Sequence, residues 1–239
     1  DIKGFLAATP EKVSQLAWNI AAPARCSKPV IAAGRGYCFG VGFELSLACD
    51  FRLASETTVY ALPEQKLGQI PGSGGSARLQ KMVGITRTKD IVMRSRRITG
   101  RQAFEWGVAT DCLPDGELEK ATDALVEELR AFSPIAQRTA KKLLNDTEDS
   151  PLSIAIELEG HCYSRLRSSE DFREGVEHDV RRRLVDDDVH LFRSADKVKY
   201  PAASCQWSWK CGSPVRMRLI LCATISSVSC SWYSSSPHF

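Results

Sequence analysis

The first half of the chain alternates short apolar runs with stretches of helical spacing. Apolar residues recur every three or four positions after Thr9-Pro10, which predicts a helix with threonine as N-cap and proline at its first position. The run "KPVIAAGRG" is typical of a short buried strand that ends in a glycine turn. The pattern then predicts a helix at 43–49, a strand at 50–54, a second strand at 58–64, and a glycine-rich loop that feeds a helix stopped by Gly84.

Capping signals organise the next part of the sequence. Thr99 and Gln102 have capping-box spacing ahead of a helix that Gly107 ends, and "VATDCLP" indicates the last strand. From Glu117 onward the spacing is helical, and two later Ser-Pro pairs mark new helix starts. Alternating strands and helices followed by helices alone predict an α/β fold with a helical C-terminal region.

The character of the sequence changes after residue 177. A densely charged stretch of mixed sign comes first, and no acidic residue follows Asp196. Residues 201–239 contain ten serines and show no helix or strand period. We therefore expect three parts: a core at 1–116, a helical region at 117–177, and an atypical tail at 178–239 that is poorly ordered and dispensable for the core.

An acidic residue occupies an apolar helical face in "GYCFGVGFELSLACD". In a helix that starts at Phe43, Glu44 shares a face with Leu47, Ala48 and Phe51. Burying an ionised carboxylate is costly, so a carboxylate at a buried position indicates a functional role. General acid/base chemistry is a role that suits such a group. The alternative is a partly exposed glutamate on a short helix of different phase.

The glycines just before Glu44 are suited to a close approach between backbone and ligand. Gly40-Val41-Gly42 would open the helix, where N–H groups lack partners and favour developing negative charge. Such a donor can stabilise an oxyanion formed from a carbonyl. A simple strand-to-helix turn would use the same glycines equally well.

A second carboxylate, Glu64, follows twenty residues later beside a Pro turn that could aim it toward the same place. Two carboxylates next to an oxyanion donor suit proton chemistry alpha and beta to a carbonyl. A loop glutamate that is merely solvated is the alternative. Nucleotide motifs fit poorly, because "GRGYCFG" spaces its last glycine wrongly and "GSGGSAR" has no following lysine. A serine hydrolase is disfavoured, because no nucleophile elbow is present.

Composition narrows the function classes further. Of the 239 residues 43% are hydrophobic and 26% charged, and the net charge of +3 gives no support for nucleic-acid binding. No apolar run approaches the roughly 20 residues of a membrane span. The nine cysteines and four histidines show no metal spacing, so we expect reduced structural cysteines, no metal, and a cytoplasmic location.

Taken together, these motifs resemble the crotonase superfamily, the enoyl-CoA hydratases and isomerases. "KPVIAAGRGYCFGVGFELSLACDFRLAS" is similar to the family's strand, glycine turn and helix, and "ALPEQKLGQIPGSGGSARLQKMVG" to its second signature. "RRITGRQAFEWGVATDCLP" resembles the segment that follows, and the resemblance runs to about Glu177. It implies a spiral of ββα repeats with a helical C-terminal region, assembled as homotrimers or homohexamers.

The resemblance also implies an activity on an acyl-CoA thioester, with no cofactor besides the coenzyme A of the substrate. Two glutamates matching Glu44 and Glu64 would add water across the 2,3-double bond. Glu44 would deprotonate the water, and Glu64 would exchange a proton with the alpha carbon. One of two oxyanion N–H groups matches Val41, beside Gly40.

The sequence departs from the family pattern at two points. Val41 stands where the family usually has glycine. The start of the chain, Asp1, Ile2 and Lys3, is similar to the end of a family motif whose preceding residue supplies the second oxyanion N–H, so we expect an N-terminal truncation. Alternatives to a hydratase are another crotonase-type isomerase or hydrolase, or a non-catalytic subunit that binds acyl-CoA or serves assembly.

Overall fold

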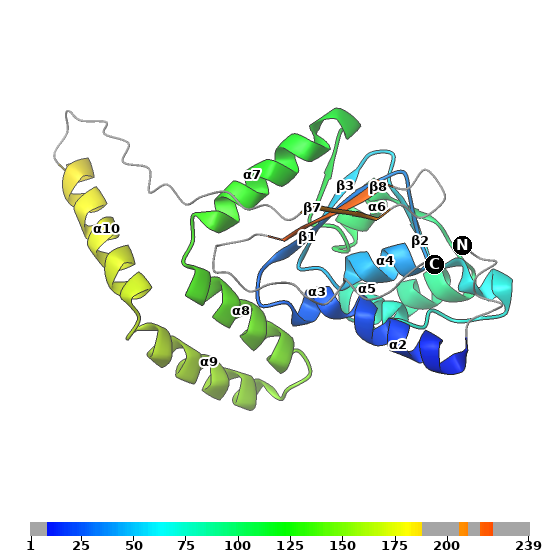
Figure 1. The fold of residues 1–239 in the computed structure, drawn as a ribbon, viewed down its shortest axis with the longest axis horizontal. Coiled ribbons are helices and arrows are strands. Elements are labelled where there is room, and N and C mark those ends of the chain that lie inside the picture. Colours follow the sequence, from blue (N-terminus) through cyan, green and yellow to red (C-terminus); the bar gives the residue numbers. More distant parts are fainter. Residues whose placement is uncertain (1–8, 188–205, 210–215, 222–239) are drawn as a thin grey trace.

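The computed structural model describes residues 9–187, 206–209 and 216–221. The core is built from two successive ββα units (Figure 1), β1 (Val30–Arg35), β2 (Tyr37–Phe39) and α4 (Val41–Leu47), then β3 (Phe51–Ser55), β4 (Val59–Ala61) and α5 (Gly75–Met93). The first strands of the two units pair in parallel, with Ile31 opposite Phe51, and so do the second strands, with Tyr37 opposite Val59. Each unit thus adds one strand to each of two sheets. This is the predicted spiral of ββα repeats.

The remaining elements complete both sheets and add the helical region. The larger sheet has the order β6-β3-β1-β8-β7 and the smaller one β2-β4-β5. The elements are α2 (Pro10–Ile20), α3 (Ala22–Arg25), η1 (Pro63–Leu67), β5 (Ile98–Thr99), α6 (Gly100–Glu105), β6 (Asp111–Leu113), η2 (Asp115–Glu117), α7 (Leu118–Arg130), α8 (Pro134–Thr147), α9 (Leu152–Leu166), α10 (Glu170–Asp187), β7 (Gln206–Trp209) and β8 (Arg216–Leu221). In Figure 1, α8, α9 and α10 lead away from the sheets as an arm.

The local signals of the sequence are found where they were expected. Thr99 and Gln102 form a capping box at the start of α6, and Gly107 follows its end with φ 76°. The N–H of Ala136 donates to Ser133 Oγ at the start of α8. Gly84 does leave helical geometry, but α5 resumes beyond it to Met93, so the expected stop is a kink.

The expectation that residues 201–239 contain no strand is wrong. β8 pairs antiparallel with β1 from Val30 opposite Leu221 to Arg35 opposite Arg216, and β7 pairs with β8. A buried strand such as β1 requires partners for the N–H and C=O groups along both of its edges. β3 pairs with one edge of β1 and β8 pairs with the other. The periodicity within a segment does not show that a distant strand needs it as a partner.

The expected boundary at residue 177 falls inside α10, which continues to Asp187. Residues 188–205, 210–215 and 222–239 lie outside the described part of the chain. The predicted disorder and dispensability of the tail, and the division into three parts, therefore stay predictions. None of the helices in the described ranges is both long enough and apolar enough to cross a membrane.

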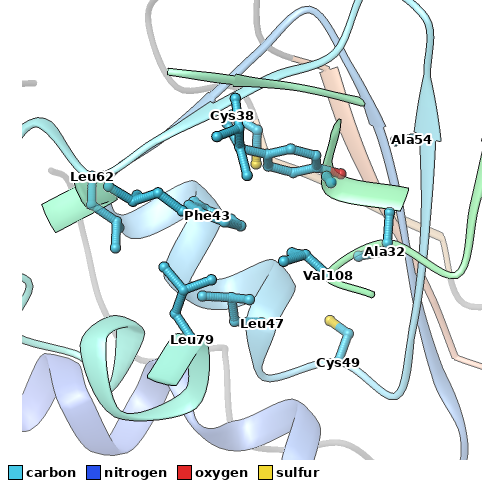
Figure 2. Packing of buried hydrophobic residues seen from close by; sticks show 14 of the residues in the cluster. Ala32, Cys38, Phe43, Leu47, Cys49, Ala54, Leu62, Leu79 and Val108 are labelled. Carbon is cyan, nitrogen blue, oxygen red and sulfur yellow. The ribbon is translucent and has the colours of Figure 1, made fainter. Parts of the chain in front are cut away.

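The main apolar core lies between α4, α5 and the small sheet (Figure 2). Phe43 and Leu47 of α4 are buried there with Leu79 of α5 and Val108. The Phe43 and Tyr60 rings lie 4.8 Å apart between centroids, a separation at which aromatic pairs attract. This packing fixes the rotation of α4 about its axis, and so the direction of every side chain on it.

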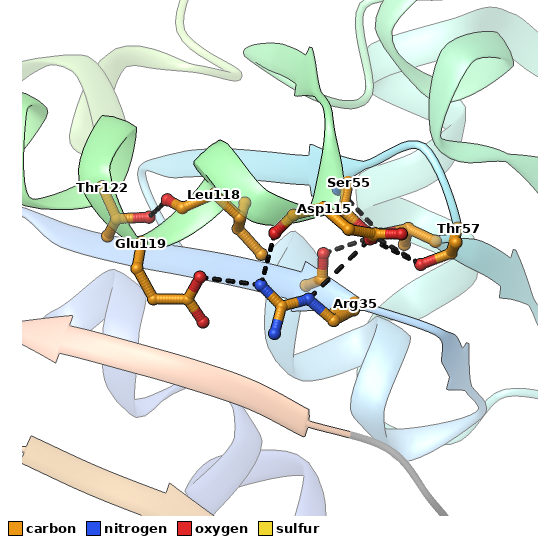
Figure 3. Close-up of polar contacts among 9 residues, drawn as sticks. Arg35, Ser55, Thr57, Asp115, Leu118, Glu119 and Thr122 are labelled. Atoms are coloured by element: carbon orange, nitrogen blue, oxygen red, sulfur yellow. Dashed lines mark hydrogen bonds and ion pairs between the residues drawn. The ribbon is translucent and has the colours of Figure 1, made fainter.

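A polar network joins the end of β1 to the start of α7 (Figure 3). Arg35 Nη2 donates to the Asp115 carbonyl at 2.6 Å and to Glu119 Oε2 at 2.7 Å. Thr57 Oγ1 donates to Asp115 Oδ1 at 2.6 Å. Because these groups are partly exposed, the network orients α7 over the sheet more than it stabilises the fold.

A buried lysine fastens the helical arm to the core. Lys141 Nζ of α8 donates to Asp50 Oδ2 at 2.6 Å and to the carbonyls of Pro23 and Lys28 at 2.7 and 2.9 Å. The same Asp50 oxygen accepts the N–H of Val30 at 2.7 Å. One ammonium therefore ties α8 to the beginning of β1 and to the turn that follows α4.

We expect Lys141→Met to lower the free energy of unfolding by about 3 kcal/mol, because it leaves the partly buried Asp50 carboxylate and two carbonyls without their cation. Lys142→Met is the matched control: its ammonium forms an exposed pair with Asp146, so it should cost less than about 1 kcal/mol. Urea unfolding of the two variants measures the difference. Equal losses would contradict the anchoring role of Lys141.

Candidate active site

Glu44 lies on the buried face of α4, as its spacing predicted. Its side chain is only 2% exposed, and Leu47 and Ala48 are buried on the same face. Glu44 Oε1 accepts two backbone N–H groups, that of Ser73 at 2.8 Å and that of Gly75 at 3.1 Å. These bonds compensate the carboxylate for its lost water.

A strained turn sets where α4 begins. Gly40 has φ 53° and ψ −125°, a conformation that side chains disfavour, and its N–H donates to the Ala61 carbonyl at 2.9 Å. Val41 follows as the first helical residue, half-buried. N–H groups in the first turn of a helix have no partner within the helix, so that of Val41 is available to an acceptor outside the helix.

Glu64 reaches the same turn from η1. A Cβ built on Gly40 would lie 2.8 Å from Glu64 Oε1, so this carboxylate rests directly against the glycine backbone. Glu64 Oε2 is buried and has no hydrogen-bond partner among the described residues. Burial raises the pKa of Glu64 above its ordinary value; a backbone hydrogen bond opposes this shift, and the charge of Glu44 adds to it.

The structure thus places four of the predicted site residues around one turn. Gly40 and Val41 form it, Glu64 touches it, and Glu44 lies one helical turn further on, near enough to influence the pKa of Glu64. Asp1, Ile2 and Lys3, expected to border the carbonyl site, lie outside the described residues.

Sequence reasoning missed the donors that hold Glu44. The stretch "GSGGSAR" fits a phosphate loop poorly and otherwise contributes only to the resemblance with the family's second signature. Ser73 and Gly75 lie 29 and 31 residues from Glu44 along the chain, so spacing does not connect them. The available signal was the density of glycine just before a helix, which favours N–H groups free to bind an anion.

Two buried cysteines, Cys38 and Cys49, lie in the apolar core beside α4. Burial raises the pKa of Cys38 and of Cys49 to about 12 each, so both stay protonated and unreactive at neutral pH. In the described part of the chain no three His, Cys, Asp or Glu side chains gather as metal ligands.

Comparison with known proteins finds similar sequences in enzymes named for acyl-CoA chemistry. The chain is 39% identical over 138 residues to the carnitinyl-CoA dehydratase of Salmonella typhimurium, which covers 58% of this chain and 51% of that protein. It is 33% identical over 150 residues to an Arabidopsis thaliana protein named "Probable enoyl-CoA hydratase 2, mitochondrial", covering 63% and 50%. The chain spans about half the length of the curated relatives it matches.

Solved structures agree in fold. The enoyl-CoA hydratase of Bacillus anthracis superposes with a TM-score of 0.73 at 32% identity, covering 76% of this chain and 72% of that one. A Thermobifida fusca YX structure in complex with CoA superposes with a TM-score of 0.63 at 31% identity, covering 67% and 63%. The sequence model of the enoyl-CoA hydratase/isomerase family matches residues 7–185. The chain belongs to the enoyl-CoA hydratase/isomerase family, within the crotonase superfamily.

Proposed function

We propose that this protein adds water across the 2,3-double bond of a trans-2-enoyl-CoA thioester, or removes it in the reverse direction. The observation that carries the proposal is the pair of carboxylates around the Gly40 turn, in two different environments. Glu44 Oε1 accepts two N–H groups, whereas Glu64 Oε2 is buried without a partner. Relatives named hydratase and dehydratase support both directions.

The proposed reaction uses one proton at each carboxylate. Glu44 takes a proton from a water molecule as the oxygen of that water bonds to the beta carbon. Glu64 gives a proton to the alpha carbon, where the former π electrons form the new C–H bond. The raised pKa of Glu64 suits a proton donor near neutral pH. The N–H of Val41 would stabilise charge that develops on the thioester oxygen.

An assay with crotonyl-CoA separates hydration from two other functions. An isomerase of the family would shift the double bond without adding water, and a non-catalytic subunit would bind acyl-CoA without turnover. Loss of enoyl absorbance on mixing with crotonyl-CoA reports hydration. Binding without that loss would favour the non-catalytic subunit.

We also propose that the chain assembles as a homotrimer or homohexamer. Exposed apolar side chains gather on α9, where Leu152 is 75% and Ile156 and Tyr163 are each 59% exposed. Their spacing of four and seven residues puts them on one face. Apolar faces of this kind favour contact with a protein partner over exposure to water. A second copy of the chain is the partner that the family resemblance favours.

Glu44→Gln and Glu64→Gln should each lower kcat for hydration by roughly 10²–10⁴-fold, because each removes a group that moves a proton. KM should change little, since glutamine preserves size and CoA contacts. The double variant should fall far short of the product of the two losses, because both groups serve one transition state. Full hydration activity in Glu44→Gln alone would contradict the two-carboxylate mechanism.

The stability of Glu64→Gln should depend on pH relative to the wild type. A carboxyl whose pKa is raised on folding favours the folded state at low pH, and this contribution is lost as pH rises through the folded value. Glutamine does not ionise, so the variant should be the more stable protein at pH 7. The difference should shrink as pH approaches about 4.3, the ordinary glutamate value. Urea unfolding across this range tests it; a constant difference would be the contrary result.

Analytical ultracentrifugation should show trimers or hexamers for the wild type and smaller species for Ile156→Asp, which places a charge on the apolar face of α9. Met93→Asp is the matched control. Met93 is similarly exposed, but it lies at the end of α5 and not on α9. A monomeric wild type would contradict this assembly, as would equal dissociation in both variants.

A further inference from the structure

The turn before α5 is shaped around the Glu44 carboxylate. Ser73 and Gly75 both direct their N–H groups at one oxygen, Oε1. No donor among the described residues is hydrogen-bonded to the other oxygen, Oε2. One oxygen is therefore held, and the other is left for chemistry.

Gly75 leaves no room for a side chain. A Cβ at this position would lie 2.8 Å from Glu44 Cγ and 3.0 Å from Oε1. Real Cβ atoms essentially never approach another atom closer than 3.0 Å, and Gly75 and Glu44 are both buried, so a side chain at position 75 would force the Glu44 side chain to shift. The carboxylate lies against the bare backbone at the beginning of α5.

Arg78 fixes the same turn from the first turns of α5. Its Nη1 donates to the Ser73 carbonyl at 3.0 Å. Its guanidinium also covers Gly74, whose φ of 89° is left-handed and where a side chain would overlap it. The arginine thus restrains the peptide unit between Ser73 and Gly74, which lies between the two donors that bind Glu44.

We propose that Ser73, Gly75 and Arg78 form a positioning cradle for Glu44, in which the backbone N–H groups of Ser73 and Gly75 fix Oε1, and Arg78 holds the turn that carries them. The inference rests on the proposed hydration function and deepens it. The cradle residues act through Glu44: they aim Oε2 at the water that is to be deprotonated. A displacement of about 1 Å in such a group can cost on the order of 10²-fold in rate.

The first test is a double-mutant cycle in the intact protein, with crotonyl-CoA as substrate. Gly75→Ala should lower kcat by about 10–100-fold and leave KM within about threefold, because it displaces a reacting group and leaves CoA contacts in place. In a Glu44→Gln background the same substitution should change kcat by less than about twofold, since the group it positions is already lost. A general structural defect would lower both backgrounds alike.

The second test uses side chains and keeps every glycine. Arg78→Gln, too short to reach the Ser73 carbonyl, should lower kcat on the order of tenfold, again with little change in KM. Arg78→Lys restores a donor and a charge and should recover most of the rate. Lys81→Gln is the matched control on α5, because Lys81 pairs only with exposed carboxylates and should keep wild-type kcat.

The outcomes separate the cradle from the proposed function. Hydration that depends on Glu44 but not on Gly75 or Arg78 would overturn the cradle and leave the function standing. Equal losses with and without the Glu44 carboxylate would overturn it too. If Gly75→Ala fails to fold, Arg78→Gln decides alone, and wild-type kcat in that folded variant counts against the cradle. A wild type that binds crotonyl-CoA without hydrating it contradicts the proposed function itself.

Discussion

The burial of the Glu44 carboxylate is the constraint on which the arrangement of this core depends. A buried anion without donors would cost several kcal/mol, so N–H groups must meet it inside the protein. Those donors lie at the start of α5, on the second ββα unit, while Glu44 lies on the first. The contact therefore fixes how the two units stack. The Phe43–Tyr60 packing beside it fixes the rotation of α4, so the apolar core and the site share one geometry.

The two carboxylates differ by environment and not by chemistry. Glu44 is supported by backbone donors, whereas Glu64 presses an oxygen against Gly40 and buries the other without a partner. Identical groups held in unlike surroundings can take the opposite roles of base and acid in one reaction. The close approach of Glu64 explains why the turn at Gly40 has this backbone conformation. Only glycine allows both the left-handed backbone and the close approach of Glu64.

Local signals in the sequence predicted most of the fold. The capping box at Thr99, the Ser133 cap and the buried phase of Glu44 depend on neighbours a few residues apart, and each is found in the structure. The donors to Glu44 and the pairing of β8 with β1 depend on contacts between distant segments. The segment "RMRLIL" is too short for its own pattern to predict a strand. It forms one because it pairs with the edge of β1 that β3 leaves open. The kink at Gly84 lies between these cases, because the residue predicts a break but not that helix resumes after it.

The buried ammonium of Lys141 joins the helical arm to the core of the protein. Lys141 holds α8 against Asp50, which directly follows the turn at the end of α4, and the same oxygen binds the first N–H of β1. The base of the arm is therefore tied to the helix that carries Glu44. Beyond that anchor, α9 turns its apolar side chains outward. The carboxylate of Asp50 and the two carbonyls together offset the cost of burying the Lys141 ammonium in α8.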